Sequence, residues 1–258
     1  MSKKTCAIIL AGGQGKRMKS DLPKPMFRVL DMPMLDWVTR ACEEAGISDI
    51  CVVTGFNSEV IEKHLDGKYH TVFQPQRMGT GHAVMMALDW LNERKDSDVL
   101  ILNGDAPFID RDTILGAHAL HEEKGNAVTV ITSEVDNPCG YGRIIRTPNG
   151  ISGIVEEKDA TAEQKNIREI NSGAYWFGTE KLIFALGEIK PNNSQGEYYL
   201  TDSVFILINA KFRADAYISS NPDTVLGAND RKGLLLLNNT ARFAIIDRLM
   251  NDGVEFTC

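Results

Sequence analysis

Apolar and polar positions follow two different rhythms along the chain. As far as residue 131, short continuous apolar runs alternate with stretches whose apolar positions recur at the helical period. The apolar runs lie at 6–11, 50–54, 71–73, 98–102 and 128–131, and the helical stretches at 34–45, 58–65, 81–93 and 111–124. Strands that are apolar at every position cannot expose one face of the sheet to water. The pattern therefore predicts an α/β fold with a doubly wound, mostly parallel sheet that is covered by helices on both faces.

The rhythm changes after residues 136–138. Residues 142–146, 151–156 and 169–177 predict strands joined by turns, and Pro148-Asn149-Gly150 is a hairpin signal between the first two. We interpret residues 137–178 as a β-rich insertion on one edge of the sheet. Helices at 180–186 and 200–209 and a strand at 212–218 complete a first domain over residues 1–230.

Residues 231–258 are predicted to form a long C-terminal arm helix followed by the start of an extended segment. The apolar positions of this helix are 234–237, 241, 244–246, 249 and 250. They are more numerous than a free surface helix needs. We therefore expect the helix to pack on this domain, on a partner chain or on a following domain.

Composition limits the possible partners. The 258 residues carry a formal net charge of −7, which argues against general binding of nucleic acid or anionic membranes. No apolar run approaches the roughly 18 residues of a membrane span. The apolar run after Lys3 and Lys4 continues straight into a glycine loop, so we interpret it as a first strand and not as a signal peptide. Five widely spaced cysteines show no disulfide framework or zinc pattern and predict a reducing, cytoplasmic location.

The glycine loop is the first candidate for chemistry. Residues 11–17, Ala-Gly-Gly-Gln-Gly-Lys-Arg, follow the first strand, and backbone N–H groups in such a loop can approach a guest closely. Arg17 and Lys24 add two cations, which predicts a polyphosphate site at the carboxyl end of the strand. The loop matches neither the Walker pattern nor the dinucleotide pattern, since Leu10 and Met18 stand where those patterns need glycine. The alternative is a glycine-rich turn with unrelated surface cations.

Two further segments follow the ends of predicted strands. Asp105, in Asn103-Gly104-Asp105-Ala106-Pro107, is a carboxylate suited to Mg²⁺, although an aspartate that caps a turn has the same pattern. In the segment 74–83, Gln74 offers an amide to a base edge, and we interpret His82 as a residue that caps or packs the start of a helix. The remaining histidines, His64, His70, His118 and His121, are interpreted as surface or edge residues.

Segments along nearly the whole chain together resemble the sugar-phosphate nucleotidyltransferases, and within them the uridylyltransferase domain of the bacterial N-acetylglucosamine-1-phosphate uridylyltransferases. The segments that carry the resemblance are 10–18, 20–24, 79–83, 104–107, 140–144, 154–160, 169–173, 196–202 and 227–231. The resemblance implies the Rossmann-like nucleotide-diphospho-sugar transferase fold. Two departures are Lys16, which stands where the family usually has threonine or serine, and the lack of the hexapeptide repeats of an acetyltransferase β-helix after the final helix.

The resemblance also implies roles for single residues. Backbone contacts to the nucleotide would be made by Leu10, Ala11, Gly12, Gly13 and Gly104. The uracil would be contacted by Gln74, Gly79 and Thr80. The positive charge needed for catalysis would come from Arg17 and Lys24, and Mg²⁺ would be bound by Asp105 and Asn229. Sugar contacts fall to Asn103, Gly142, Glu156, Asn171 and Asn229. From the residues alone, Asn229 is more simply the N-cap of the final helix, and Glu156 and Asn171 are polar residues at strand ends and turns.

The implied reaction joins UTP and N-acetylglucosamine 1-phosphate into UDP-N-acetylglucosamine, a peptidoglycan precursor, with release of pyrophosphate. The sugar phosphate is already anionic near neutral pH, because the second pKa of a phosphate is about 6, so no general base is needed. Positioning and positive charge, including Mg²⁺, carry such a transfer. The alternatives are another sugar 1-phosphate such as glucose 1-phosphate, another base, or a non-catalytic regulatory subunit that binds nucleotide sugars.

Overall fold

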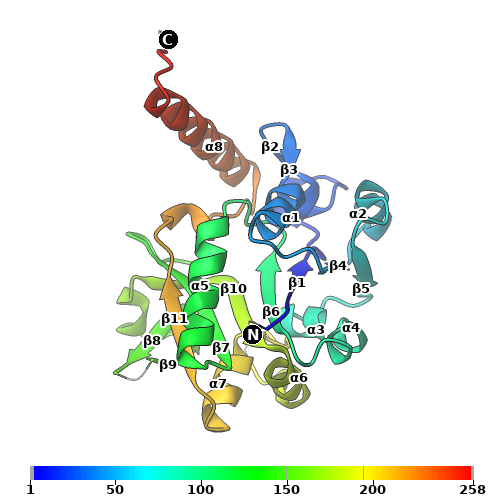
Figure 1. Ribbon diagram of the computed structural model, residues 1–258, viewed down its shortest axis with the longest axis vertical. Coiled ribbons are helices and arrows are strands. Elements are labelled where there is room, and N and C mark those ends of the chain that lie inside the picture. Colours follow the sequence, from blue (N-terminus) through cyan, green and yellow to red (C-terminus); the bar gives the residue numbers. More distant parts are fainter. Residues whose placement is uncertain (1–2, 149, 194, 257–258) are drawn as a thin grey trace.

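A single large sheet runs through the centre of the molecule (Figure 1). The computed structural model describes residues 3–148, 150–193 and 195–256. The main path of the sheet has the strand order β11-β7-β10-β6-β1-β4-β5. These strands are β1 (Thr5–Leu10), β4 (Ile50–Thr54), β5 (His70–Phe73), β6 (Asp98–Asn103), β7 (Val128–Glu134), β10 (Glu169–Gly178) and β11 (Ala214–Ile218).

The strand β1 lies at the point where the connections of the sheet change direction. It pairs in parallel with β4 on one side and with β6 on the other, so that Leu10 lies opposite both Val53 and Asn103. The chain after β1 builds outward through β4 to β5, and then returns to place β6 on the other flank of β1. Open α/β sheets bind ligands in the crevice beyond the carboxyl ends of the strands at such a point.

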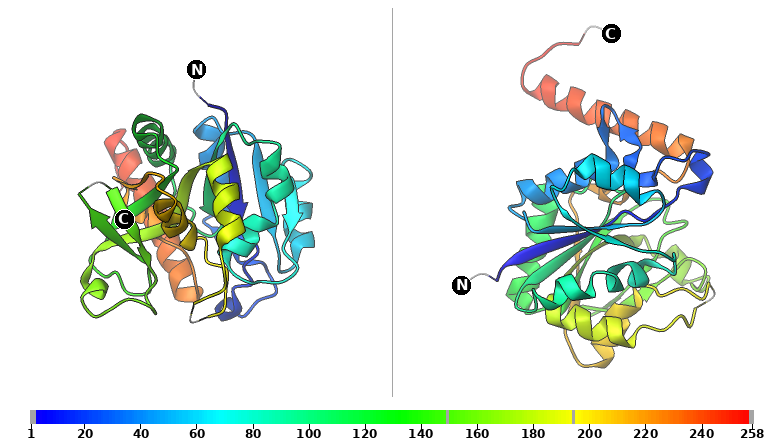
Figure 2. Two further views of the ribbon diagram at one scale, coloured as in Figure 1. Left: turned by 90° about the horizontal axis from the view of Figure 1, so that it is seen from below. Right: turned by 90° about the vertical axis from the view of Figure 1, so that its right-hand side faces the viewer.

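Helices cover both faces of the sheet, as the second view of Figure 2 shows. On one face lie α1 (Met34–Glu44), α2 (Ser58–Leu65) and α5 (Arg111–Lys124); on the other lie α3 (Thr80–Met85), α4 (Leu88–Asn92), α6 (Thr179–Glu188) and α7 (Asp202–Asn209). In β1, Ala7 and Ile9 pack toward the first group, and Cys6 and Ile8 toward the second. Because both faces are buried, the strand is apolar at every interior position, and the predicted α/β class with a mostly parallel sheet is confirmed.

The prediction of a single helix over residues 81–93 is wrong. The structure divides it into α3 and α4, with Ala87 at φ −93° and ψ 14° between them. The N–H of Ala87 donates to the carbonyl of Val84 at 3.0 Å, a tighter turn than the α-helical one, and this ends α3. The segment contains no glycine or proline at the break, so the sequence carried no signal for it.

The strand β10 does not belong to an edge insertion. It lies inside the main sheet, antiparallel to both β6 and β7. Only β8 (Arg143–Thr147) and β9 (Gly150–Val155) form the expected hairpin, which joins the sheet where Arg143 pairs with Ile170 of β10. Within the hairpin signal Pro148-Asn149-Gly150, Asn149 lies outside the described residues.

The helix α8 (Arg231–Asn251) projects from the body, and only its first half is packed (Figure 1). Leu237 and Ala241 are buried in a small cluster with Val29 and Met34, next to the ribbon of β2 (Arg28–Val29) and β3 (Met32–Pro33). Farther out, side chains such as Phe243, 69% exposed, face solvent. Of the three alternatives expected for α8, packing on this domain is shown for the first half of the helix. Among the described residues, no helix combines the length and the apolar character needed to cross a membrane.

The N-cap of α5 offers a test of how the helix is held. The Asp110 carboxylate accepts hydrogen bonds from the backbone N–H of Thr113 and from the Asn221 side-chain amide, each at 2.7 Å. We expect Asp110→Ala to lower the free energy of unfolding by about 1–2 kcal/mol, because both donors lose their acceptor. Urea unfolding measures the change. Asp112→Ala, at an exposed position two residues further along, is the control and should stay within about 0.5 kcal/mol; equal effects would contradict the capping role.

Candidate active site

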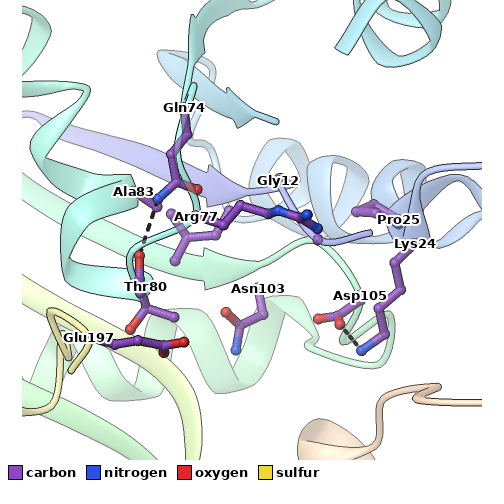
Figure 3. A pocket seen from close by; sticks show the side chains of 13 residues that line it. Gly12, Lys24, Pro25, Gln74, Arg77, Thr80, Ala83, Asn103, Asp105 and Glu197 are labelled. Atoms are coloured by element: carbon purple, nitrogen blue, oxygen red, sulfur yellow. Dashed lines mark hydrogen bonds and ion pairs between the residues drawn. The ribbon is translucent and has the colours of Figure 1, made fainter. Parts of the chain in front are cut away.

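Two adjoining cavities, of about 290 and 260 Å³, open beyond the carboxyl ends of β1 and β6. Both are lined by Leu10, Lys24, Thr80, Asn103 and Asp105, so they form one cleft with two halves, of which Figure 3 shows the first. The first half adds the expected nucleotide residues Gly12, Gly13, Gln74 and Gly79. The second half adds the expected sugar and metal residues Gly142, Glu156, Asn171 and Asn229. The cleft therefore gathers residues from Leu10 to Asn229, segments that are far apart in the chain.

The Lys24 side chain joins the two halves. Its ammonium makes an ion pair with the Asp105 carboxylate, toward which it points in Figure 3, and donates a hydrogen bond to Oδ1 of Asn229 at 2.8 Å. A carboxylate and an amide oxygen are the ligand types that Mg²⁺ prefers. The Lys24 ammonium occupies the position of a cation between these two oxygens. The oxygens of Asp105 and Asn229 therefore fit a divalent metal ion.

The alternative role of Asn229 as a helix cap is wrong. The N-cap of α8 is the next residue, Asp230, whose carboxylate accepts from the N–H of Gly233 at 2.8 Å. Since Asp230 caps the helix, the Asn229 side chain is left to point into the cleft. The sequence could not separate the two neighbours, because asparagine and aspartate are equally good caps.

Glycine loops give the cleft its floor. The chain passes so close to itself here that a Cβ on Gly55 would lie 2.7 Å from the Cα of Gly12. At Gly79, φ is +107° and a Cβ would lie 2.5 Å from the Tyr198 carbonyl oxygen. Only glycine fits these positions without displacing backbone. The N–H of Lys24 donates to the carbonyl of Gly13 at 3.1 Å, which ties the loop to the lysine.

Three predicted site residues line neither cavity. Ala11 is buried and its N–H donates to the Val53 carbonyl at 2.8 Å, and the N–H of Gly104 donates to the Leu10 carbonyl at 2.9 Å. These two residues support the floor of the cleft from below. Arg17 lies in the short 3₁₀-helix Lys16–Met18, and its side chain is exposed at the margin of the loop, as is that of Lys16.

The nucleotide half contains a hydrogen-bonded pair that sequence reasoning missed. The Gln74 side chain is buried; its Nε2 donates to the carbonyl of Gly79 at 3.2 Å and lies 3.0 Å from Nδ1 of His82. His82 therefore does more than pack the start of α3, because it orients the amide that was expected to meet a base. Arg77 and Glu197 also line this half and were not predicted. Arg77 falls within the segment 74–83 and Glu197 within the segment 196–202, and these segments were the available signals.

The second half is walled by polar groups whose positions are fixed by hydrogen bonds. Asn171 donates from Nδ2 to the Tyr175 hydroxyl at 2.6 Å and accepts from the N–H of Gly173 at 2.9 Å. Glu156 accepts from the Thr201 hydroxyl at 3.3 Å. Burial raises the pKa of the Glu156 carboxyl, and the nearby carboxylates of Asp159 and Asp202 raise it further.

Arg143 supports this wall from behind and was also missed. Its guanidinium is 1% exposed, makes an ion pair with Glu157 at 2.8 Å and donates to the Tyr141 carbonyl. These contacts hold the turn that carries Gly142, whose carbonyl accepts from the N–H of Asn171 at 2.9 Å. An arginine inside a predicted strand gives no local signal that it is buried.

Comparison with known proteins identifies the family of the chain. Residues 6–221 match the model of the nucleotidyl transferase family, and the chain belongs to that family. Curated relatives named bifunctional protein GlmU are 43% identical over 249 residues in Acetivibrio thermocellus and 41% identical over 252 residues in Streptococcus mutans. These alignments cover 96% and 97% of this chain but 54% and 55% of the relatives. The chain therefore spans about half the length of these relatives.

Solved structures support the fold. A putative glucose-1-phosphate thymidylyltransferase from Bacillus anthracis has a TM-score of 0.76 at 19% identity, with coverage of 99% of this chain and 98% of that one. A UDP-glucose pyrophosphorylase solved with UDP-glucose has a TM-score of 0.75 at 20% identity, with coverage of 95% and 100%. At these identities the likeness shows the shared Rossmann-like fold and no more.

The raised pKa of Glu156 predicts a pH-dependent stability. In acid, below the ordinary glutamate pKa of about 4.3, the carboxyl is protonated in both the folded and the unfolded chain and contributes nothing. Above its raised pKa, the folded chain must carry a charge that burial disfavours, so ionisation of Glu156 destabilises the fold. We expect Glu156→Gln to raise the free energy of unfolding at neutral pH and to leave it unchanged in acid, as measured by urea unfolding.

The neighbouring Glu157 is the matched control with the opposite sign. The Arg143 guanidinium holds the pKa of the Glu157 carboxyl below its usual range. Glu157→Gln should therefore lower stability at neutral pH and lose this effect in acid. A Glu156→Gln protein that is less stable than the parent at neutral pH would contradict the assignment of Glu156 as a disfavoured buried charge.

Proposed function

We propose that this protein is a Mg²⁺-dependent uridylyltransferase that makes UDP-N-acetylglucosamine and pyrophosphate from UTP and N-acetylglucosamine 1-phosphate. The observation that carries the proposal is the contact of Lys24 with Asp105 and Asn229 at the boundary between the two halves of the cleft. Both substrates are anions, and their phosphates must meet where positive charge is concentrated. This cluster is where the halves meet.

The two halves suit two different ligands. The nucleotide half has glycine backbone beside the oriented Gln74 amide, which suits a flat base that is read by its edge. The sugar half offers fixed acceptors and donors in Glu156, Asn171 and Asn103, which suits the hydroxyl and acetamido groups of a sugar. In this arrangement the sugar phosphate oxygen attacks the α-phosphorus in line, and pyrophosphate leaves toward the glycine loop.

The protein's own residues then supply position and charge. The sugar phosphate is an anionic nucleophile near neutral pH, so no side chain has to remove a proton. Lys24 shifts from Asp105 and Asn229 to the phosphate oxygens and neutralises the charge that develops on the transferring group. Arg17, at the margin of the loop, pairs with the leaving pyrophosphate. Asp105 and Asn229 would hold Mg²⁺, which when bound supplies charge neutralisation to both substrates.

The choice of N-acetylglucosamine rests on the relatives. The curated relatives at 41–43% identity are named GlmU, the bifunctional N-acetylglucosamine-1-phosphate uridylyltransferases. The solved glucose-1-phosphate and UDP-glucose enzymes share only 19–20% identity with this chain. Sequence similarity therefore favours the amino-sugar branch over the glucose branch.

Pyrophosphate release with UTP, Mg²⁺ and a panel of sugar 1-phosphates tests the substrate. We expect N-acetylglucosamine 1-phosphate to react with a kcat/KM well above that of glucose 1-phosphate, and EDTA to abolish release. A preference for glucose 1-phosphate would move the protein to the other branch. If no pyrophosphate is released with any sugar 1-phosphate of the panel and any of the four common nucleoside triphosphates, the result would favour a subunit that binds nucleotide sugars without turnover.

Asp105→Asn tests the metal ligand. The substitution removes the charge while keeping one oxygen, and we expect kcat to fall by about 10²–10³. Circular dichroism and urea unfolding should show a normally folded protein, since the Asp105 side chain is 27% exposed and asparagine has nearly the same size and shape. Asp247→Asn, at an exposed position on α8, is the matched control and should keep full activity. Full activity of the Asp105→Asn protein would remove Asp105 from the mechanism.

A further inference from the structure

A second cluster of charged and ligating side chains lies at the other end of β6. The strand begins at Asp98 and ends at Asn103, so roughly 16 Å of strand separates this cluster from the nucleotide cleft. The last two turns of α5, which packs on β7, β10 and β11, contribute His118, His121 and Glu122. Residues at positions i, i+3 and i+4 of a helix share one face, which brings all three side chains toward Asp98.

The Asp98 carboxylate is the centre of the cluster and is 1% exposed. Its Oδ1 accepts a hydrogen bond from the Lys3 ammonium at 2.9 Å, and its Oδ2 lies 3.3 Å from Nε2 of His118. On the helix, Nδ1 of His118 lies 3.9 Å from a Glu122 oxygen. The ligating atoms of Asp98, His118 and Glu122 all lie within 4.8 Å of one another.

His121 supplies an independent observation. The residue is 2% exposed, and its Nδ1 lies 3.0 Å from the Thr129 hydroxyl. Its other nitrogen, Nε2, is buried and has no hydrogen-bond partner among the described residues, although it faces Oδ1 of Asp98 at 3.8 Å. The buried Nε2 of His121 is therefore available as a metal ligand that faces the cluster. The expectation that His121 is a surface or edge residue is therefore wrong.

We propose that Asp98, His118, His121 and Glu122 form a binding site for one transition-metal ion of the Zn²⁺ type. Two imidazoles with carboxylates are the ligand set of zinc and its neighbours in the first row, whereas Mg²⁺ prefers oxygen alone. Tetrahedral bonds of about 2.0–2.1 Å place neighbouring ligand atoms about 3.3–3.4 Å apart. The 3.3 Å separation of the His118 nitrogen and the Asp98 oxygen has this length.

The surroundings complete the site. The Thr129 hydroxyl accepts the Nδ1–H of His121 in the metal-bound form, which is how ligand histidines are oriented in metal sites. A cavity lined by Lys3, Asp98, His121 and Glu122 provides the path of entry. The Lys3 side chain is 57% exposed and occupies the cationic position beside Asp98, so a bound metal ion displaces it toward solvent. The site does not depend on the nucleotidyltransferase proposal.

Calorimetric titration with Zn²⁺ in excess Mg²⁺ tests the site, because Mg²⁺ saturates oxygen-ligand sites such as that at Asp105. We expect stoichiometric binding, and at least about a 10-fold loss of affinity in His118→Ala and in His121→Gln, since even partners of metal ligands contribute 10–100-fold. His70→Ala, an exposed histidine on β5, is the matched control and should bind as the parent does. Affinity unchanged in both cluster variants, or no binding by the parent, would overturn the proposal.

Two further measurements remain decisive if a histidine variant fails to fold. Lys3→Ala should bind Zn²⁺ several-fold more tightly if the lysine competes for Asp98; equal or weaker binding would mean that Asp98 belongs only to a structural ion pair. Co²⁺ bound to the parent should show the visible bands of a tetrahedral site without a sulfur charge-transfer band. A sulfur band would assign the metal to a cysteine such as the exposed Cys139 and overturn the site.

Discussion

The ammonium of Lys24 lies between the side chains of Asp105 and Asn229, and the rest of the cleft depends on that contact. The three residues come from a loop after β1, a loop after β6 and the segment before α8. The first two are neighbours because β1 and β6 pair in parallel and end together at Leu10 and Asn103. Asn229 has no strand to position it, so the structure must hold its segment in another way.

The first half of α8 provides that support. The Arg231 guanidinium donates to the Met18 carbonyl at 3.1 Å, and the Asn238 side chain accepts from the N–H of Leu30 at 2.8 Å. Both contacts fasten α8 to the chain that follows the glycine loop. The helix thus links the phosphate-binding segment to the segment that carries Asn229. Its packed turns have a role in the site even though its outer half is exposed.

The elements that the sequence predicted well are those defined by local pattern. The strand at 50–54 and the helices at 58–65 and 111–124 have the predicted bounds, because strand periodicity and helix caps are written in consecutive residues. The place of β10 in the sheet was missed, since pairing with β6 and β7 is decided by residues far away in the chain. The same reason explains the missed roles of His82, Arg143 and His121, whose partners come from other elements.

The strand β6 shows how one sequence can carry chemistry at both ends. Its interior, Val99 to Leu102, is at most 1% exposed and packs against helices on both faces, where an unpaired polar side chain would lose its hydration. Polar residues are therefore confined to Asp98 and Asn103, where loops and helix ends supply partners. Just beyond the carboxyl end Lys24 pairs with Asp105, and at the amino end Lys3 and the histidines of α5 lie beside Asp98. The same strand therefore positions the nucleotide cleft beyond its carboxyl end and the proposed metal site at its amino end.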